Sequence, residues 1–172
     1  TGHIGVAGTE ATVASKAYDE AIAQAAEREG KACTVTSVAC PLFVPLAEEG
    51  WMSHAATELI AREYLAPLIE AGVDTLILGC THYPILAEAI GRAMGPDVTL
   101  VNSGAIAART VAELLRADAP SAGSSAAAGT VPESSFLVSD VPRKFQQIGE
   151  RFLGRPMPQV RHVMWKESWV MV

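Results

Sequence analysis

Short apolar runs alternate along this chain with longer segments whose apolar residues recur every three or four positions. The short runs predict β-strands, and the longer segments predict helices with one buried face. Regular alternation of strand and helix is typical of an α/β fold, in which helices flank a parallel sheet. The predicted strands are residues 3–7, 34–39, 74–78, 99–101 and 136–138, and the predicted helices are residues 12–29, 53–70, 83–94, 105–116 and 141–153.

The composition changes abruptly after the fourth of these helices. Residues 118–135 consist mostly of Ala, Ser, Gly and Pro, which cannot bury enough surface to offset the entropy lost on ordering. We therefore predict an α/β domain at 1–117, a linker at 118–135, and a strand, helix and tail at 136–172. One strand and one helix do not make a stable domain. We therefore expect residues 136–172, including Trp165 and Trp169, to pack on the domain at 1–117, on another chain or on a part of the protein missing here.

Charge and cysteine content limit the classes of function. The chain has 172 residues, 49% of them hydrophobic, and a formal net charge of -6, which argues against nucleic acid as a partner. Neither a spanning helix of about 18 apolar residues nor a signal segment is present, so we expect no membrane partner. Three cysteines without a regular framework favour a reducing compartment, and we predict a cytoplasmic protein.

The strongest candidate for chemistry is Cys80, which directly follows the predicted strand at 74–78. It lies in the segment Leu-Gly-Cys-Thr-His-Tyr-Pro at 78–84. A thiol at a strand-to-helix turn meets free backbone N–H groups and the helix dipole, both of which favour a thiolate. The alternative is that Cys80 is a small buried hydrophobic residue.

Further candidates surround this cysteine in the predicted fold. His82 could bind a substrate carboxylate or assist proton transfer, or it could be an ordinary core imidazole. Thr9 and Thr12 follow the first strand and suit either helix capping or ligand binding. Residues 41–50 contain two prolines and predict a rigid loop, from which Glu48 could orient His82. The spacing of Cys33, Cys40, Cys80 and His82 fits no paired zinc motif, and no motif for a phosphate or imine-forming cofactor is present.

Four blocks of sequence together resemble the glutamate racemase family, which belongs to the cofactor-independent aspartate/glutamate racemase superfamily. The resemblance covers about the first 117 residues strongly and the segment from Ser139-Asp140 onwards more weakly. The blocks are Gly-Thr-Glu-Ala-Thr-Val at 8–13, Ala-Cys-Pro-Leu-Phe-Val-Pro-Leu-Ala-Glu-Glu-Gly at 39–50, Asp-Thr-Leu-Ile-Leu-Gly-Cys-Thr-His-Tyr-Pro at 74–84 and Val-Asn-Ser-Gly at 101–104.

The resemblance implies a fold of two α/β domains and an isomerase that interconverts L- and D-glutamate for peptidoglycan, without metal or cofactor. Two cysteines on opposite faces of the substrate α-carbon would move the proton, and Cys80 matches the second of them. Thr81 and His82 would contact the substrate, and His82 would also assist Cys80. Thr9 and Thr12 would line the same site, and Glu48 would support His82.

The chain also departs from the family pattern. The family's first α/β domain, with its Asp-Ser, Tyr-Gly and Cys-Asn-Thr segments, has no counterpart here, and neither Cys33 nor Cys40 matches the first cysteine. We therefore expect an incomplete racemase that is inactive alone and depends on a missing N-terminal domain. The resemblance implies that residues 136–172 pack on that missing domain. The alternatives are an inactive racemase-like binding or assembly module, or a racemase for aspartate or another acidic amino acid. The sequence leaves a homodimer open.

Overall fold

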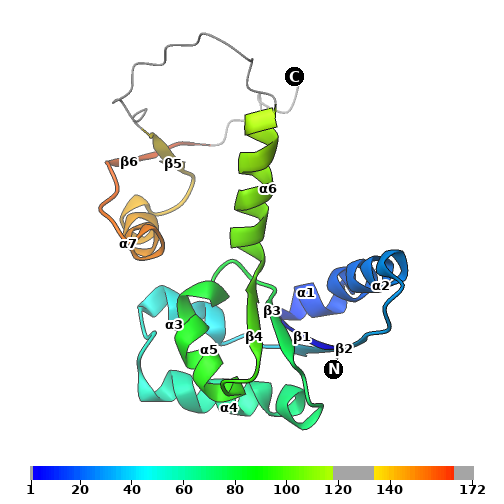
Figure 1. Ribbon diagram of the computed structural model, residues 1–172. Helices are drawn as coiled ribbons and strands as arrows, with labels where there is room; N and C mark the ends of the chain where they lie inside the picture. The colour runs from blue at the N-terminus through cyan, green and yellow to red at the C-terminus, as the bar shows by residue number, and fades with distance from the viewer. Residues whose placement is uncertain (1, 118–133, 165–172) are drawn as a thin grey trace. The chain divides into compact units, whose positions relative to one another are not determined.

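The computed structural model describes residues 2–117 and 134–164, and the chain divides into two compact units at residues 119 and 120. Each unit is described by itself (Figure 1). Residues 118–133 of the predicted linker lie outside the described residues, as do Trp165 and Trp169 of the predicted docked tail. The three-part division at 1–117, 118–135 and 136–172 therefore stays a prediction.

The first unit is built on a four-stranded sheet with every strand parallel to its neighbours, and this confirms the predicted α/β fold. The strands lie in the order β2-β1-β3-β4. Their register places Ile4 of β1 between Val35 of β2 and Thr75 of β3. The strands are β1 His3–Gly8, β2 Thr34–Ala39, β3 Thr75–Leu78 and β4 Thr99–Asn102.

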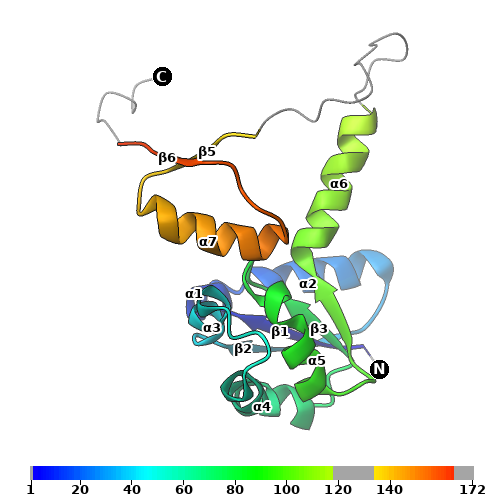
Figure 2. The same cartoon turned by 90° about the vertical axis from the view of Figure 1, so that its left-hand side faces the viewer.

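Helices cover both faces of this sheet. Helices α3, α4 and α5 lie on one side, and α1 and α2 lie on the other (Figures 1 and 2). The helices of this unit are α1 Glu10–Ala14, α2 Ala17–Glu29, α3 Phe43–Glu49, α4 Ala55–Glu70, the 3₁₀ turn η1 Tyr83–Leu86, α5 Ala87–Met94 and α6 Ser103–Ala117.

The hydrophobic core lies between the sheet and helices α3 to α5. Leu76 and Leu78 of β3 are buried there against Leu65 and Leu68 of α4. The core also contains an aromatic group in which Phe43 meets Tyr64 and Tyr83 edge to face, at ring-centroid distances of 5.6 and 5.2 Å. This geometry is favoured because the positive edge of one ring meets the negative face of another.

The helix predicted at 12–29 is wrong in its continuity, because the structure divides it into α1 and α2. Helix α1 ends at Ala14, and the hydroxyl of its C-cap residue Ser15 donates to the carbonyl of Thr12 at 2.7 Å. Lys16 follows with a left-handed backbone, φ 58°, which costs a residue with a β-carbon roughly 1–2 kcal/mol. Two separate helix axes result, and the shorter helix stays close to the ends of β1 and β2.

The loop predicted at 41–50 is also wrong, since seven of its residues form helix α3. Pro45 is the third residue of this helix, where its missing N–H would have no intrahelical partner. Gly50 ends the helix with φ 78°, a left-handed conformation that glycine adopts without steric cost. Two prolines therefore shape the start of a helix here rather than preventing one.

Two other predicted helices differ in detail from the observed ones. The segment 83–94 begins with the 3₁₀ turn η1, and α5 starts only at Ala87. Proline inside a helix normally kinks or breaks it, but α4 contains Pro67 and runs without a break from Ala55 to Glu70. Pro67 is exposed, so water can solvate the carbonyl that loses its intrahelical partner.

The second unit contains β5 Phe136–Val138, helix α7 Pro142–Leu153 and β6 Val160–His162. Strands β5 and β6 pair in parallel, and the strand β6 was not predicted. Glu150 joins the helix to the connection before β6, because its carboxylate accepts from Gln146 Nε2 and from the Met157 amide, both at 3.1 Å.

The core of the first unit predicts a clear contrast between two leucines of α4. Leu65 is fully buried, whereas Leu59 is 68% exposed. Leu65→Ala should lower the free energy of unfolding by about 2–5 kcal/mol, because it removes buried methyl groups and leaves a cavity. Leu59→Ala should change it by no more than about 0.5 kcal/mol. Urea denaturation of the two variants measures both values, and equal losses would contradict the assigned core.

Candidate functional site

The order of the strands identifies one edge of the sheet as the place for a site. The chain passes from β1 outwards to β2, then crosses back to β3 on the other side of β1. In open parallel sheets, ligands bind at the carboxyl ends of the strands where this change of direction occurs. Here that point lies between Thr9, which follows β1, and Cys80, which follows β3.

Thr9 and Thr12 lie side by side at the end of β1. Thr9 is the N-cap of α1, and its Oγ1 accepts from the Thr12 amide at 3.2 Å. The two Oγ1 atoms are 2.9 Å apart. Helix capping is therefore one role of Thr9, and both hydroxyls are half-exposed beside the change of strand order. Their predicted contact with a substrate stays a prediction.

Cys80 is held beside β1 by the glycine that precedes it. The Gly79 amide donates to the Ala7 carbonyl at 2.8 Å. A β-carbon on Gly79 would lie 3.0 Å from that same oxygen and 3.1 Å from Tyr18 Cε2, closer than side-chain carbons normally come. A side chain at position 79 would therefore force its neighbours to shift, and the close approach places Cys80 at the switch between β1 and β3.

The surroundings of Cys80 differ in part from the sequence prediction. The residue is half-buried, with one side against the hydrophobic core and the other lining an open hollow. It is thus not an entirely buried structural thiol. The turn after it is the four-residue η1, and α5 begins seven residues later. Because a helix dipole acts mainly within its first turn, the dipole of α5 gives Cys80 less support than the sequence argument assumed.

The structure brings together His82 and Glu48, as the sequence argument proposed. His82 Nε2 lies 3.6 Å from Glu48 Oε1, and both side chains are about three-quarters buried. His82 Nδ1 lies 3.4 Å from the Thr81 hydroxyl. If Nε2 carries the proton that faces the carboxylate, Nδ1 is left to accept from Thr81. Helix α3, which was expected to be a loop, presents Glu48 to this imidazole.

The other two cysteines are poorly suited to act with Cys80. Cys40 is fully buried, and burial raises the pKa of its thiol to about 12, so it stays protonated at neutral pH. Cys33 precedes β2 and therefore lies at the opposite end of the sheet from Cys80. The six residues of β2 alone span about 20 Å. Of the chain's three cysteines, Cys80 is therefore the one whose thiol lies at the candidate site.

A hollow of about 510 Å³ opens beside Cys80 towards β4 and α6, with Thr81, Pro84, Asn102 and Ser103 among its lining residues. Ser103 donates to the Leu78 carbonyl at 3.0 Å, and Asn102 Oδ1 accepts from the Ala105 amide at 3.0 Å. These bonds fix the start of α6 beside the end of β3. The wall of the hollow next to Cys80 is therefore ordered by its own hydrogen bonds.

Comparisons with known proteins show the family to which the chain belongs. Residues 1–111 match the Asp/Glu/Hydantoin racemase family. The chain belongs to this family. It is also 45% identical over 163 residues to a glutamate racemase of Syntrophus aciditrophicus and 47% identical over 165 residues to one of Geobacter metallireducens. Each alignment covers 95% of this chain and 57% of the relative.

A solved structure gives the same result. The crystal structure of a glutamate racemase from Francisella tularensis in complex with D-glutamate superposes with a TM-score of 0.79 and 34% identity. The match covers 98% of this chain and 59% of that one. The resemblance noted from the sequence is thereby confirmed, and the chain spans a little more than half the length of the relatives it matches.

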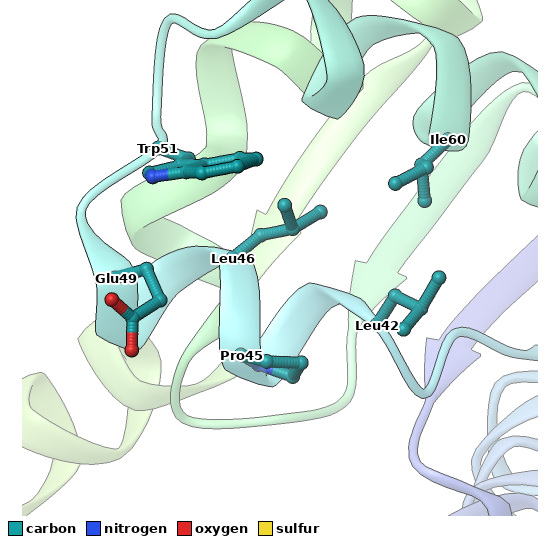
Figure 3. A pocket seen from close by; sticks show the side chains of 6 residues that line it. All are labelled: Leu42, Pro45, Leu46, Glu49, Trp51 and Ile60. Atoms are coloured by element: carbon teal, nitrogen blue, oxygen red, sulfur yellow. The ribbon is translucent and has the colours of Figure 1, made fainter.

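A second, smaller hollow lies beside α3, away from Cys80. It measures about 210 Å³ and is lined by apolar side chains, with Glu49 as the one charged residue. Figure 3 shows Leu46 between Trp51 and Ile60, with Glu49 at one end. The two adjacent glutamates of α3 therefore lie in different environments: Glu48 faces His82, whereas Glu49 is exposed.

Two features bear on metal and membrane binding. Within residues 2–117 and 134–164, no group of three or more His, Cys, Asp or Glu side chains is arranged to hold a metal ion. Across those same ranges, none of the helices combines the length and the apolar character needed to cross a membrane.

Sequence reasoning missed one residue that the fold places at the centre of this edge. Tyr83 is completely buried, and its hydroxyl lies 2.9 Å from the Gly8 carbonyl and 2.8 Å from the Cys40 carbonyl. From the sequence, a tyrosine in an apolar segment is expected to be an ordinary core residue. Only its position, directly after Cys80, Thr81 and His82, could have indicated a connection with the site.

The close contact at Gly79 predicts a sharp response to one methyl group. Gly79→Ala should lower the free energy of unfolding by about 1–3 kcal/mol, because the new β-carbon meets backbone that cannot move freely. Gly91→Ala is the matched control, since its β-carbon would meet only Leu100 Cδ1 at 3.5 Å. That helical change should be neutral or stabilising by up to about 1 kcal/mol. Thermal denaturation compares the two, and a harmless Gly79→Ala would contradict the described approach of β3 to β1.

Proposed function

We propose that this chain is part of a glutamate racemase, in which Cys80 is one of two cysteines that move a proton at the α-carbon of glutamate without a cofactor. The observation that carries the proposal is the pairing of His82 with Glu48 and Thr81 in the turn that begins at Cys80, at the switch point of a sheet in a chain of the racemase family. The resemblance to glutamate racemases over 95% of the chain supports glutamate as the substrate.

The proposed reaction needs two groups on opposite faces of one carbon. On one face, a thiolate takes the α-proton, so that an S–H bond forms while the C–H electron pair stays on carbon and spreads into the carboxylate. On the other face, a thiol gives its proton to that carbon and becomes a thiolate. In the reverse direction the two sulfurs exchange roles. No electron is gained or lost overall.

The side chains around Cys80 have the chemistry to assist this transfer. The α-proton of an amino acid is a very weak acid, so donors fixed in advance must stabilise the charge that develops in the transition state. In our proposal, Thr81 and His82 bind the substrate, and the Glu48 carboxylate orients the His82 imidazole at 3.6 Å. Thr9 and Thr12 supply two hydroxyls from the β1 side of the same edge.

In this proposal, the opposing thiol comes from a further domain of a longer protein. Cys40 is buried and Cys33 lies at the other end of the sheet, so neither suits the role. The relatives extend well beyond the matched region, since the chain covers 57% of their length. Four large apolar side chains of α6 are exposed and fit a surface that another domain covers: Ile106, Val111, Leu114 and Leu115.

The biological role follows from the proposed product. D-glutamate is a building block of peptidoglycan, so we propose that the protein supplies a precursor of the cell wall and works in the cytoplasm. The proposal for this isolated chain is that it binds part of the substrate but does not racemise it.

The role of Cys80 predicts the behaviour of one variant of the complete racemase that contains this chain. Cys80→Ser should lower racemisation of glutamate by about 10²- to 10⁴-fold, because the hydroxyl is a far weaker proton-transfer group than the thiol. In deuterated water, exchange of the α-proton should survive for one enantiomer, since the opposing thiol is intact. Circular dichroism follows racemisation, and NMR follows the exchange.

Cys33→Ser is the control for this experiment, because it makes the same atomic change at the other end of the sheet. It should leave both rates unchanged. Normal turnover by Cys80→Ser would refute the proposed function. Racemisation of L-aspartate at a rate equal to that of L-glutamate would refute the choice of substrate.

A further inference from the structure

The buried hydroxyl of Tyr83 connects the ends of two strands. Its oxygen lies within hydrogen-bond distance of the Gly8 carbonyl, at the end of β1, and of the Cys40 carbonyl, directly after β2. Both partners are acceptors, so the single phenol proton must serve the two carbonyls together or in turn. Each carbonyl would lose this donor if the hydroxyl were removed.

Each of these carbonyls belongs to a segment that carries a candidate residue of the site. Gly8 immediately precedes Thr9, and Cys40 leads into α3, which bears Glu48. Tyr83 itself follows His82 directly. One side chain therefore links the three segments that present Thr9, Glu48 and His82.

The ring of Tyr83 strengthens the same link. It meets Phe43, the first residue of α3, edge to face at 5.2 Å and 86°. A contact of this kind contributes about 0.5–1.5 kcal/mol beyond the burial of area. The ring thus fixes the start of α3, while the hydroxyl fixes the backbone just before it.

The Tyr83 hydroxyl stays protonated near neutral pH and therefore remains a hydrogen-bond donor. Burial is the largest cause that raises the pKa of Tyr83 well above its ordinary value, and the negative charge that Cys40 and Cys80 carry as thiolates would raise it further. The hydroxyl therefore keeps its proton, and the two hydrogen bonds do not depend on pH in the working range.

We propose that Tyr83 is a positioning residue that sets the distance between the Thr9 segment, Glu48 and the Cys80-Thr81-His82 turn. This proposal rests on the function proposed above, because the positioned residues are those of the racemase site. Tyr83 acts through its neighbours and touches no reacting atom. It holds the groups on the two sides of the strand switch at the separation that the substrate needs.

The test compares Tyr83→Phe with Tyr64→Phe in the complete racemase. Both substitutions remove one hydroxyl from an aromatic ring that packs on Phe43, but only Tyr83 bonds the strand ends. Tyr83→Phe should lower kcat by roughly 10- to 100-fold, because small displacements of catalytic groups cost much of the rate. KM should stay within about threefold if the loss falls on the transition state, and Tyr64→Phe should leave both constants within about twofold.

Amide hydrogen exchange in the 172-residue chain separates positioning from a general loss of stability. In Tyr83→Phe, exchange should rise about tenfold or more at Cys40, Phe43 and Gly79, whose amides donate to the carbonyls of Gly8, Cys40 and Ala7. Core amides of β3 such as Leu76 should keep the rate set by global unfolding. Equal acceleration at all of these amides would overturn the proposal, as would unchanged exchange at Cys40, Phe43 and Gly79. This readout does not depend on activity, so it also holds if the protein proves not to be a racemase.

Kinetics and hydrogen exchange together show whether the proposed racemase function or the proposed role of Tyr83 has failed. A wild-type protein without racemase activity would refute the proposed function, whatever Tyr83→Phe does to hydrogen exchange. An active wild type whose Tyr83→Phe variant keeps its full kcat would refute the positioning role. Loss of kcat together with local acceleration of exchange supports both.

Discussion

The position of Cys80 depends on the close approach of two backbones at the end of the central strands. The Gly79 amide donates to the Ala7 carbonyl at 2.8 Å, and a β-carbon at position 79 would come within 3.0 Å of that oxygen. This contact brings β3 alongside β1 up to the last residue of the sheet. Since the direction of the chain changes between these two strands, the same contact places the thiol where parallel sheets bind ligands.

Side chains from three segments complete that edge. Thr9 follows β1, Glu48 comes from α3 after β2, and His82 follows β3, with Glu48 and His82 lying 3.6 Å apart. The segments are far apart in the sequence and are joined in the fold by Tyr83, whose hydroxyl reaches the carbonyls of Gly8 and Cys40. In this arrangement, the buried part of the protein controls the geometry of the residues that face solvent.

The sequence predicted the strands well because each is a short apolar run between turn signals, and parallel order followed from the alternating helices. It failed where local signals conflict. Pro41 and Pro45 indicated a loop, yet proline at the start of a helix loses no hydrogen bond, and α3 forms. Lys16 gave no sign of the left-handed conformation that divides 12–29, because lysine has no preference for it. The three residues of β6 are too few to show a period.

The sequence predicted which residues gather at the candidate site, but not the contacts that hold them there. Thr9 and the Cys80-Thr81-His82 turn directly follow strands, and Thr12 lies in the short helix after Thr9. Their common location therefore follows from parallel topology. The pairing of Glu48 with His82 was inferred from chemistry, and the structure places the two side chains together. Tyr83 was missed because a hydrogen bond to distant backbone carbonyls leaves no mark in a sequence. The catalytic roles of all these residues stay predictions.

The central claim is that this chain forms one side of a racemase site and lacks the opposing thiol. The most direct test measures D-glutamate formed from L-glutamate by the 172-residue chain alone, beside the complete protein in which it is joined to a domain that carries the second cysteine. We predict racemisation by the complete protein and none above buffer by the chain alone. Robust racemisation by the 172-residue chain would contradict the account.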